Sequence, residues 1–208
     1  MNKIGVFGGT FNPVHKGHEL AAVEFYTKLN LDKLLIIPAN IPPHKKSCGD
    51  ISPMSRLEMC GICFDKYKNY NIEVSDIEIK KSGVSYTFDT LESLLKIYQK
   101  DFNIIYFLVG SDMFLYLEKW HKYKELLDMC VFTVAFRNNT ESPENSEVLK
   151  LRDKLANQGY KTELLNNKAF EISSTELREK LNSGLDSADY LSPEVLDYIK
   201  EKNLYVLQ

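Results

Sequence analysis

Residues 4–18 read IGVFGGTFNPVHKGH, and this stretch decides the fold that the sequence predicts. Its apolar start, residues 4–7, is typical of a short buried strand, and a helical pattern follows from about residue 16 to residue 29. Gly8 and Gly9 stand directly after the strand, where glycine lets the backbone approach a ligand closely. The N-terminus of the following helix offers unpaired N–H groups and a positive dipole end to an anion. The stretch therefore predicts a strand–loop–helix unit that binds phosphate.

The remainder of the chain alternates in the same way between strand-like and helix-like stretches. We expect further strands at residues 33–37, 72–74, 103–109, 131–135 and 170–172. Helices are expected at residues 54–67, 88–98, 112–127, 147–158, 174–182 and 194–202. The alternation predicts an α/β fold with a doubly wound, mainly parallel sheet and helices on both faces. We expect a single domain over residues 1–208, with a small C-terminal helical part from about residue 173 to residue 208.

The bulk composition favours a globular protein that binds neither nucleic acid nor membranes. The hydrophobic share of 44% in 208 residues is ordinary for a domain that buries a core. A net charge of −3 without a basic block argues against a nucleic-acid binder that relies on phosphate contacts. No segment approaches the ~18 apolar residues of a membrane span, and the opening does not resemble a signal peptide. We therefore expect a cytoplasmic protein; its oligomeric state is open, and a homo-oligomer is compatible with these numbers.

The four cysteines, Cys48, Cys60, Cys63 and Cys130, include one suggestive pair, CGIC at residues 60–63. A zinc site needs about four ligands, and no second CxxC or nearby HxxxH supplies the other two. A thioredoxin-like pair follows a strand and opens a helix, whereas this pair lies well inside an apolar-periodic stretch. The pattern favours cysteines buried in a helix. We expect no metal site built by the chain itself.

His15 and His18 are three residues apart, which places both imidazoles on one face of the first helical turn. Gly17 between them removes a side chain that would crowd a phosphate. Imidazole N–H groups donate hydrogen bonds to phosphate oxygens, and such bonds are stronger when the acceptor is charged. The alternative is a glycine turn followed by two surface histidines. The preceding GGTFNP favours the phosphate site.

A second element, ISSTELR at residues 172–178, combines the end of a short strand with the start of a helix. Ser173 and Glu176 fit a capping box, so the simplest interpretation is a well-capped helix. Arg178 lies one turn on from Ser174, and its planar guanidinium suits a phosphate near the helix start. Capping and phosphate binding use the same geometry, so this element carries weight only together with the HxGH string.

Four segments are expected to meet at one edge of the sheet. Parallel α/β sheets bind ligands beyond the C-terminal ends of their strands, at the point where the strand order reverses. The segments are residues 8–18, the proline-rich loop at residues 38–53, residues 110–112 and residues 173–178. A ligand site built from all four is the prediction.

The two motifs together resemble those of the nucleotidyltransferase superfamily that carries HxGH and SSTxxR-type motifs. Further segments are similar to those of nicotinate-mononucleotide adenylyltransferases, and they occur in the order found in that family. They are PANIPPHK at residues 38–45, SYTFDT at residues 85–90, GSDMFLYLEKWH at residues 110–121 and LSPEVLDYIKEKNLY at residues 191–205. The resemblance covers nearly the whole chain.

The resemblance implies an enzyme that transfers AMP from ATP to nicotinic acid mononucleotide, forming nicotinic acid adenine dinucleotide and pyrophosphate. It also implies direct in-line attack without a covalent intermediate, and Mg²⁺ bound together with ATP. The residues implied to be catalytic are His15, His18 and Arg178. Those implied to bind ATP are Gly8, Gly9, Thr10, Phe11, His18, Gly110, Asp112, Ser173, Ser174, Thr175 and Arg178. Those implied to bind the mononucleotide are His15, His44, Lys45, Ser85, Tyr86, Thr87, Trp120 and Arg137.

The resemblance also implies how the pyridine ring and its carboxylate are bound. Backbone N–H groups of Tyr86 and Thr87 would meet the carboxylate, and Trp120 would stack on the ring. Without the resemblance, the only tryptophan of the chain is more simply interpreted as an anchor of the core.

Three positions depart from the family pattern. Glu19 stands where a leucine usually follows HxGH, and Val84 replaces the usual proline before SYT. The segment FRNN at residues 136–139 lacks the usual Arg-Pro-Gly, which puts the role of Arg137 in doubt.

Several other classes compete with this interpretation. Phosphopantetheine adenylyltransferases and cytidylyltransferases share HxGH but do not fit the PPHK, SYTxDT and Trp-His segments. A class I aminoacyl-tRNA synthetase is disfavoured by the short chain and its acidic balance. A non-catalytic nucleotide sensor would be expected to lose the histidine and basic donors, and all of them are present. An ordinary Rossmann dehydrogenase needs GxGxxG after the first strand, and GGTF does not match it.

Overall fold

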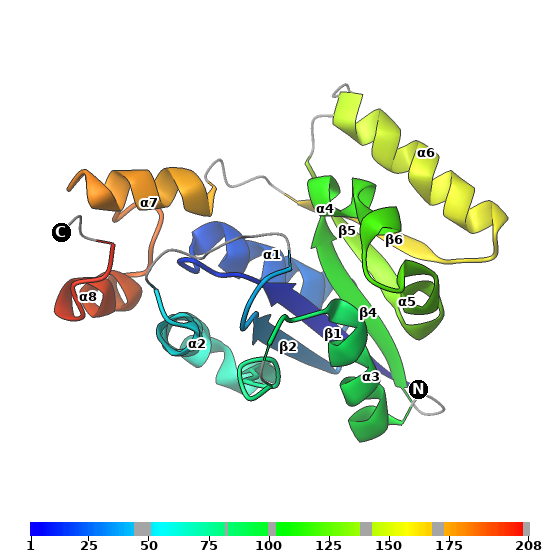
Figure 1. The fold of residues 1–208 in the computed structure, drawn as a ribbon, viewed down its shortest axis with the longest axis horizontal. Helices are drawn as coiled ribbons and strands as arrows, with labels where there is room; N and C mark the ends of the chain where they lie inside the picture. Colours follow the sequence, from blue (N-terminus) through cyan, green and yellow to red (C-terminus); the bar gives the residue numbers. More distant parts are fainter. Residues whose placement is uncertain (44–50, 82, 100–102, 138–142, 168–172, 206–208) are drawn as a thin grey trace.

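The computed structural model describes residues 1–43, 51–81, 83–99, 103–137, 143–167 and 173–205 (Figure 1). Its centre is a six-stranded sheet with the order β3-β2-β1-β4-β5-β6. The strands are β1 (Asn2–Gly9), β2 (Lys33–Pro38), β3 (Ile72–Val74), β4 (Asn103–Gly110), β5 (Val131–Arg137) and β6 (Thr162–Asn167). Every neighbouring pair is parallel, which confirms the predicted fold class.

The strand order reverses at β1, whose two neighbours are β2 and β4. The register aligns Gly9 with Pro38 across one pair and Phe7 with Leu108 across the other. The C-terminal ends of the three central strands therefore lie at one edge. This is the switch point at which doubly wound sheets bind ligands.

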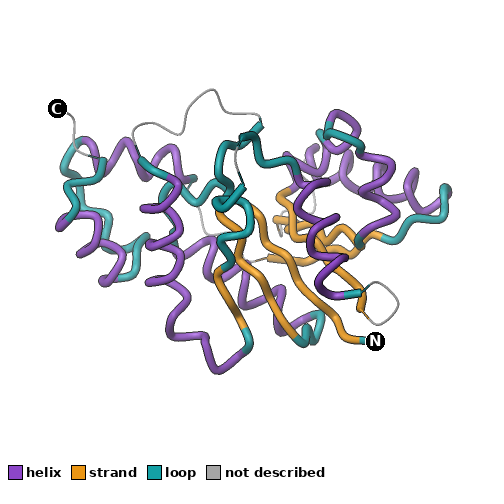
Figure 2. The backbone as a smooth tube through the Cα atoms, turned by 60° about the horizontal axis from the view of Figure 1, so that its bottom comes forward, coloured by secondary structure: helices purple, strands orange, loops and turns teal. Residues whose placement is uncertain are grey.

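Helices cover both faces of the sheet (Figure 2). One face carries α1 (Lys16–Lys28), α2 (Pro53–Phe64), α7 (Ser174–Asn182) and α8 (Pro193–Glu201). The other carries α3 (Thr87–Tyr98), α4 (Ser111–Leu115), α5 (Tyr123–Met129) and α6 (Pro143–Asn157). Two short 3₁₀ helices, η1 (Asp65–Tyr70) and η2 (Leu117–Lys119), complete the regular elements of the described residues.

The central strands are apolar on both sides because each face has its own core. On β2, Leu34 and Ile36 belong to the cluster under α1 and α2, whereas Leu35 and Ile37 belong to the cluster under α3 and α5. Successive strand side chains point to opposite faces, so a continuous apolar run is what two buried faces require. In the described part of the chain, no helix is both long and apolar enough to cross a membrane.

One predicted element differs from the structure, and one strand of the sheet was not predicted. The single helix expected at residues 112–127 is broken into α4, η2 and α5, because Trp120 is extended and Lys122 has a left-handed backbone with φ 53°. The break lets the Trp120 ring pack edge-on against Phe107 and Phe132. The strand expected at residues 170–172 lies outside the described residues and stays a prediction, whereas β6, the sixth strand of the sheet, was not predicted.

Candidate active site

Residues 8–15 end β1 and lead into α1; this segment, the phosphate loop, is shaped around the buried ring of Phe11. Phe11 has a left-handed backbone with φ 49°, and its ring meets the rings of Phe7 and His18 edge-on. A Cβ added at Gly9 would lie 3.0 Å from the Phe11 ring, so only glycine fits there without displacing it. Glycine was predicted here because it lets a ligand approach the backbone. At Gly9 it is also needed to leave room for the Phe11 ring.

His15 and His18 cap the N-terminus of α1 reciprocally. His15 Nδ1 accepts a hydrogen bond from the Gly17 N–H at 3.2 Å, and His18 Nδ1 accepts one from the His15 N–H at 3.3 Å. The two ring centroids are 3.8 Å apart. Because both Nδ1 atoms accept, each neutral ring carries its proton on Nε2. The pair therefore presents two N–H donors at a helix N-terminus, where an anion is favoured.

Burial lowers the pKa of His15 from its usual 6.5 to about 4. The imidazole is therefore a neutral donor at pH 7 in the free protein, and it does not need to be cationic to bind a phosphate oxygen. Because the folded-state pKa lies below the unfolded value, the unfolded chain binds more protons between pH 4 and pH 6.5. Stability from this group is present above pH 6.5 and is lost as the pH falls through that window.

We predict that lowering the pH from 7 to 5 costs about 2 kcal/mol of unfolding free energy through His15 alone. The matched variant is His15→Asn, because asparagine also caps a helix but does not titrate in this range. Urea unfolding of both proteins at the two pH values measures the difference. An equal loss of stability in wild type and variant would show that His15 is not buried in its neutral form.

The second predicted motif docks directly on the first. Arg178 Nη1 donates to Asn12 O at 2.9 Å and to Ser174 O at 3.1 Å, and its Nη2 donates to Thr175 Oγ1 at 3.1 Å. Ser174 Oγ donates to Pro13 O at 3.3 Å. The N-terminus of α7 therefore lies against the loop that precedes α1, although the two are about 160 residues apart in the chain.

Ser173 and Glu176 form the capping box that the sequence predicts. Glu176 N donates to Ser173 Oγ at 3.2 Å, and Ser173 N donates to Glu176 Oε2 at 2.7 Å. The interpretation of Ser173 as a helix cap is thus confirmed, and its side chain is exposed. Ser174, Thr175 and Arg178 are the members of this motif that touch the phosphate loop or one another.

A cavity of about 680 Å³ opens above the C-terminal ends of β1 and β4. The phosphate loop forms one side of it, and the start of α3 with the α4–α5 connection forms another. Its lining residues with predicted roles are Gly8, Gly9, Thr10, Ser85, Tyr86, Thr87, Gly110, Asp112 and Trp120. Predicted residues from distant segments are therefore brought together, while His15, His18 and α7 lie beside this cavity rather than in its wall.

Asp112 folds back over the end of β4. A Cβ added at Gly110 would lie 2.7 Å from Asp112 Oδ1, so glycine is required for the carboxylate to take this position. Glu78 is the other carboxylate in the cavity wall. It is buried and accepts a 2.7 Å hydrogen bond from Thr90 Oγ1, and burial raises its pKa above the usual value.

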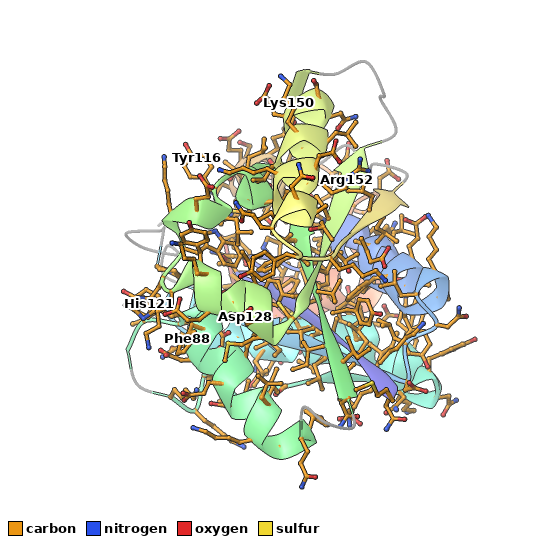
Figure 3. The ribbon with its side chains drawn as sticks, turned by 90° about the vertical axis from the view of Figure 1, so that its right-hand side faces the viewer. Phe88, Tyr116, His121, Asp128, Lys150 and Arg152 are labelled. Carbon is orange, nitrogen blue, oxygen red and sulfur yellow. The ribbon has the colours of Figure 1, made fainter. Side chains whose placement is uncertain are left out.

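The N-terminus of α3 faces the cavity without a side-chain cap. Its N-cap residue, Tyr86, accepts no capping hydrogen bond, and Tyr86 and Thr87 both line the cavity. The Tyr86 ring packs on His121 with centroids 4.7 Å apart. Figure 3 shows His121 beside Phe88, on the same side of the molecule. Uncapped amides at the start of this 12-residue helix can bind a carboxylate.

Trp120 serves the core and the cavity together. Its ring meets Phe107 and Phe132 edge-on, each with centroids 6.1 Å apart, and it also lines the cavity. Among the described residues, its buried Nε1 has no hydrogen-bond partner. Both interpretations of this tryptophan are therefore consistent with its position.

Arg56 is a site residue that the sequence reasoning missed. It is fully buried on α2, and its guanidinium donates to Thr10 O at 2.7 Å and to Asn40 O at 2.9 Å. A signal for it existed, because Arg56, Met59, Cys60 and Cys63 share the helical spacing of the buried face of α2. A charge on such a face needs partners, and those partners are backbone carbonyls of two loops of the site.

Glu19, the departure from the family leucine, is held by polar partners rather than by apolar packing. Its carboxylate accepts a 2.6 Å hydrogen bond from Tyr67 Oη and forms a 2.7 Å ion pair with Lys66. The nearby Cys63 and its neighbour Cys60 are buried and free, as predicted, and burial with the Glu19 charge raises the pKa of Cys63 to about 12.

Some predicted residues lie outside the description. His44 and Lys45, together with Cys48, belong to residues 44–50, which the structure does not describe. Arg137 ends β5, and nothing is described of its side chain. Their roles stay predictions.

Comparison with known proteins agrees with this geometry. A family model described as Cytidylyltransferase-like matches residues 6–180. The nicotinate-nucleotide adenylyltransferase of Bacillus subtilis is 35% identical over 208 residues, which are 99% of each chain. A protein of Fusobacterium nucleatum named as a probable nicotinate-nucleotide adenylyltransferase is 37% identical and covers 96% of this chain and 98% of its own.

Solved structures show the same fold. The nicotinic acid mononucleotide adenylyltransferase of Plasmodium falciparum, complexed with NaAD, has a TM-score of 0.79 and 22% identity, and covers 99% of this chain and 98% of its own. The same protein complexed with APC has a TM-score of 0.76. With the full-length relatives above 30% identity, the conclusion is direct: the chain belongs to the nicotinate-nucleotide adenylyltransferase family.

Proposed function

We propose that the protein transfers AMP from ATP to nicotinic acid mononucleotide, forming nicotinic acid adenine dinucleotide and pyrophosphate. The observation that carries the proposal is one cavity lined by the phosphate loop and by the uncapped start of α3. Nicotinic acid mononucleotide is an anion at both ends, with a phosphate on one and a carboxylate on the other. The N-terminus of α1, beside the cavity, and the start of α3, in its wall, match these two ends.

The substrate phosphate attacks the α-phosphorus of ATP in line. One P–O bond forms, the bond between the α-phosphorus and the β-bridging oxygen breaks, and pyrophosphate leaves with the electron pair. A phosphate is already anionic near neutral pH, so the attack needs neither a general base nor a covalent intermediate. The work of the protein is then to position two anions and to stabilise the charge that develops between them.

The residues at the phosphate loop have the chemistry for that work. The Nε2–H groups of His15 and His18 would donate to phosphate oxygens at the N-terminus of α1. Arg178, held over the same loop through Asn12 O, would bind the ATP phosphates near the departing pyrophosphate. Asp112 would accept hydrogen bonds from ribose hydroxyls of the adenosine part. Donors that are already in place cost no reorganisation when the transition state forms.

Mg²⁺ would enter together with ATP. The described residues contain no group of three or more histidine, cysteine or carboxylate side chains that could hold a metal ion. Mg²⁺ bound through nucleotide phosphates typically keeps several waters and uses only one or two protein carboxylates, and Asp112 and Glu78 are the carboxylates of the cavity wall. When bound, the ion neutralises phosphate charge. A cytoplasmic location and a homo-oligomeric state stay predictions.

The experiment that tests the function is pyrophosphate release by the wild-type protein with ATP, Mg²⁺ and nicotinic acid mononucleotide. Release is expected only when both nucleotides are present, with the dinucleotide formed in equal amount. Release from ATP alone would indicate a hydrolase and contradict the proposal.

A further inference from the structure

We propose that Arg56 is a positioning residue that sets the spacing between the phosphate loop and the start of α3, and thereby the preference for the acid mononucleotide. The inference rests on the proposed function and deepens it. Arg56 itself is behind the wall of the cavity, since it is fully buried and is not among the lining residues. It acts through the loops whose carbonyls it binds.

The first of these carbonyls belongs to the phosphate loop. Arg56 Nη1 donates to Thr10 O at 2.7 Å, and Thr10 lines the cavity next to Gly9. The bond is charge-assisted and short, and the Arg56 side chain that donates it is fully buried. It therefore fixes the distance between the Thr10 carbonyl of the phosphate loop and α2.

The second carbonyl leads to the start of α3. Arg56 Nη2 donates to Asn40 O at 2.9 Å. Asn40 N donates in turn to Ser85 Oγ at 2.9 Å, and Asn40 Nδ2 donates to Lys81 O at 2.9 Å. Ser85 immediately precedes the uncapped N-cap residue Tyr86. One guanidinium thus links the phosphate loop to the carboxylate site through a single intermediate residue.

The chemistry of arginine suits this link. The guanidinium is planar and always charged, and its donors have fixed relative directions, so two acceptors bound to it keep a fixed separation. A mononucleotide has its phosphate and its pyridine carboxylate at a separation that its own covalent structure limits. Both contacts form together only when the two sites are correctly spaced. A pocket that binds the phosphate but misplaces α3 loses the contribution of the carboxylate, and with it the distinction from the amide.

The test compares Arg56→Met with Met59→Ala. Methionine fills the volume without the two donors. Met59 is equally buried one turn further along α2 and does not line the cavity. We expect Arg56→Met to lower kcat about 10²-fold, as misplacement by about 1 Å does. We also expect the ratio of kcat/KM for acid over amide mononucleotide to collapse. Met59→Ala is expected to lower the Tm but keep both quantities at wild-type values.

Two further variants keep the proposal testable when Arg56→Met does not fold. Arg56→Lys keeps the positive charge but not the planar pair of guanidinium donors. The ratio of kcat/KM for acid over amide mononucleotide is expected to lie between those of the wild type and Arg56→Met. Asn40→Ala removes the side-chain bonds to Lys81 O and Gly83 O but keeps the backbone bonds to Arg56 and Ser85, so it should raise the KM for the acid mononucleotide less than Arg56→Met does, with the KM for ATP unchanged.

The outcomes separate this inference from the function on which it rests. An inactive wild-type protein would contradict the function itself. An active wild type with unchanged selectivity in Arg56→Met, or in Arg56→Lys where the methionine variant does not fold, would overturn the inference and leave the function intact. Equal kinetic losses in Arg56→Met and Met59→Ala would likewise overturn it, because they would reduce Arg56 to a general contribution to stability.

Discussion

Replacement of His18 with alanine is expected to lower kcat about 10²–10³-fold, the loss typical of removing one preorganised donor to a developing oxyanion. The reason lies in the first turn of α1, where His18 Nδ1 is occupied by the His15 N–H and Nε2 is left to carry the proton. The effect should fall on kcat more than on the KM for either substrate, because the donor acts most strongly on charge that develops in the transition state.

His18→Gln is the matched control for this prediction. The glutamine amide places an N–H group near the position of the imidazole Nε2, so part of the activity should return. Circular dichroism checks that both variants keep the helical content of the wild type. Near-wild-type kcat in His18→Ala, or a loss of fold, would contradict the catalytic role.

Replacement of Trp120 with alanine is expected to raise the KM for nicotinic acid mononucleotide about tenfold or more, while the KM for ATP changes little. Stacking of an aromatic ring on a base contributes about 1–3 kcal/mol by alanine substitution. Trp120 is well placed for it, since the ring lines the cavity and is steadied by Phe107 and Phe132. Steady-state kinetics with each substrate varied in turn provides the two KM values.

Phe132→Leu separates stacking from packing in this experiment. Phe132 supports Trp120 but is not part of the cavity wall, so its loss loosens the core without removing the ring that faces the substrate. Similar rises of both KM values in Trp120→Ala, matched by Phe132→Leu, would assign Trp120 to the core alone.

The parts of the fold with local signals could be predicted from the sequence. Apart from Asn103, the run at residues 103–109 is apolar because β4 is buried on both faces, and α1 begins at Lys16 as the glycine loop indicates. The capping box at Ser173 is likewise a local pattern that the structure confirms. In each case, the residues that carry the signal also make the contact.

Features that depend on tertiary contacts were not predicted. Residues 112–127 have a helical pattern, but the chain leaves the helix at Trp120 because the ring gains its partners on β4 and β5. The edge strand β6 carries the mixed sequence TELLNN, whose pattern is too weak for a strand signal, and it forms through pairing with β5.

Arg56 shows a different limit of sequence reasoning. Helical periodicity places it on the buried face of α2, yet nothing local identifies the carbonyls of Thr10 and Asn40 as its acceptors. Those acceptors are 46 and 16 residues away along the chain. The location of such a residue can be read from a sequence, whereas its role requires the fold.

The protein is proposed to bind both anionic ends of nicotinic acid mononucleotide, the phosphate at the start of α1 and the carboxylate at the start of α3. The most direct test is pyrophosphate release from ATP and Mg²⁺ with three acceptors in parallel: nicotinic acid mononucleotide, nicotinamide mononucleotide and phosphopantetheine. We expect rapid release with the acid form and none with phosphopantetheine. Release with the amide should be much slower, because the amide lacks the negative charge that the start of α3 would bind. Comparable rates with acid and amide would contradict the carboxylate site, and release with phosphopantetheine alone would contradict the proposed function.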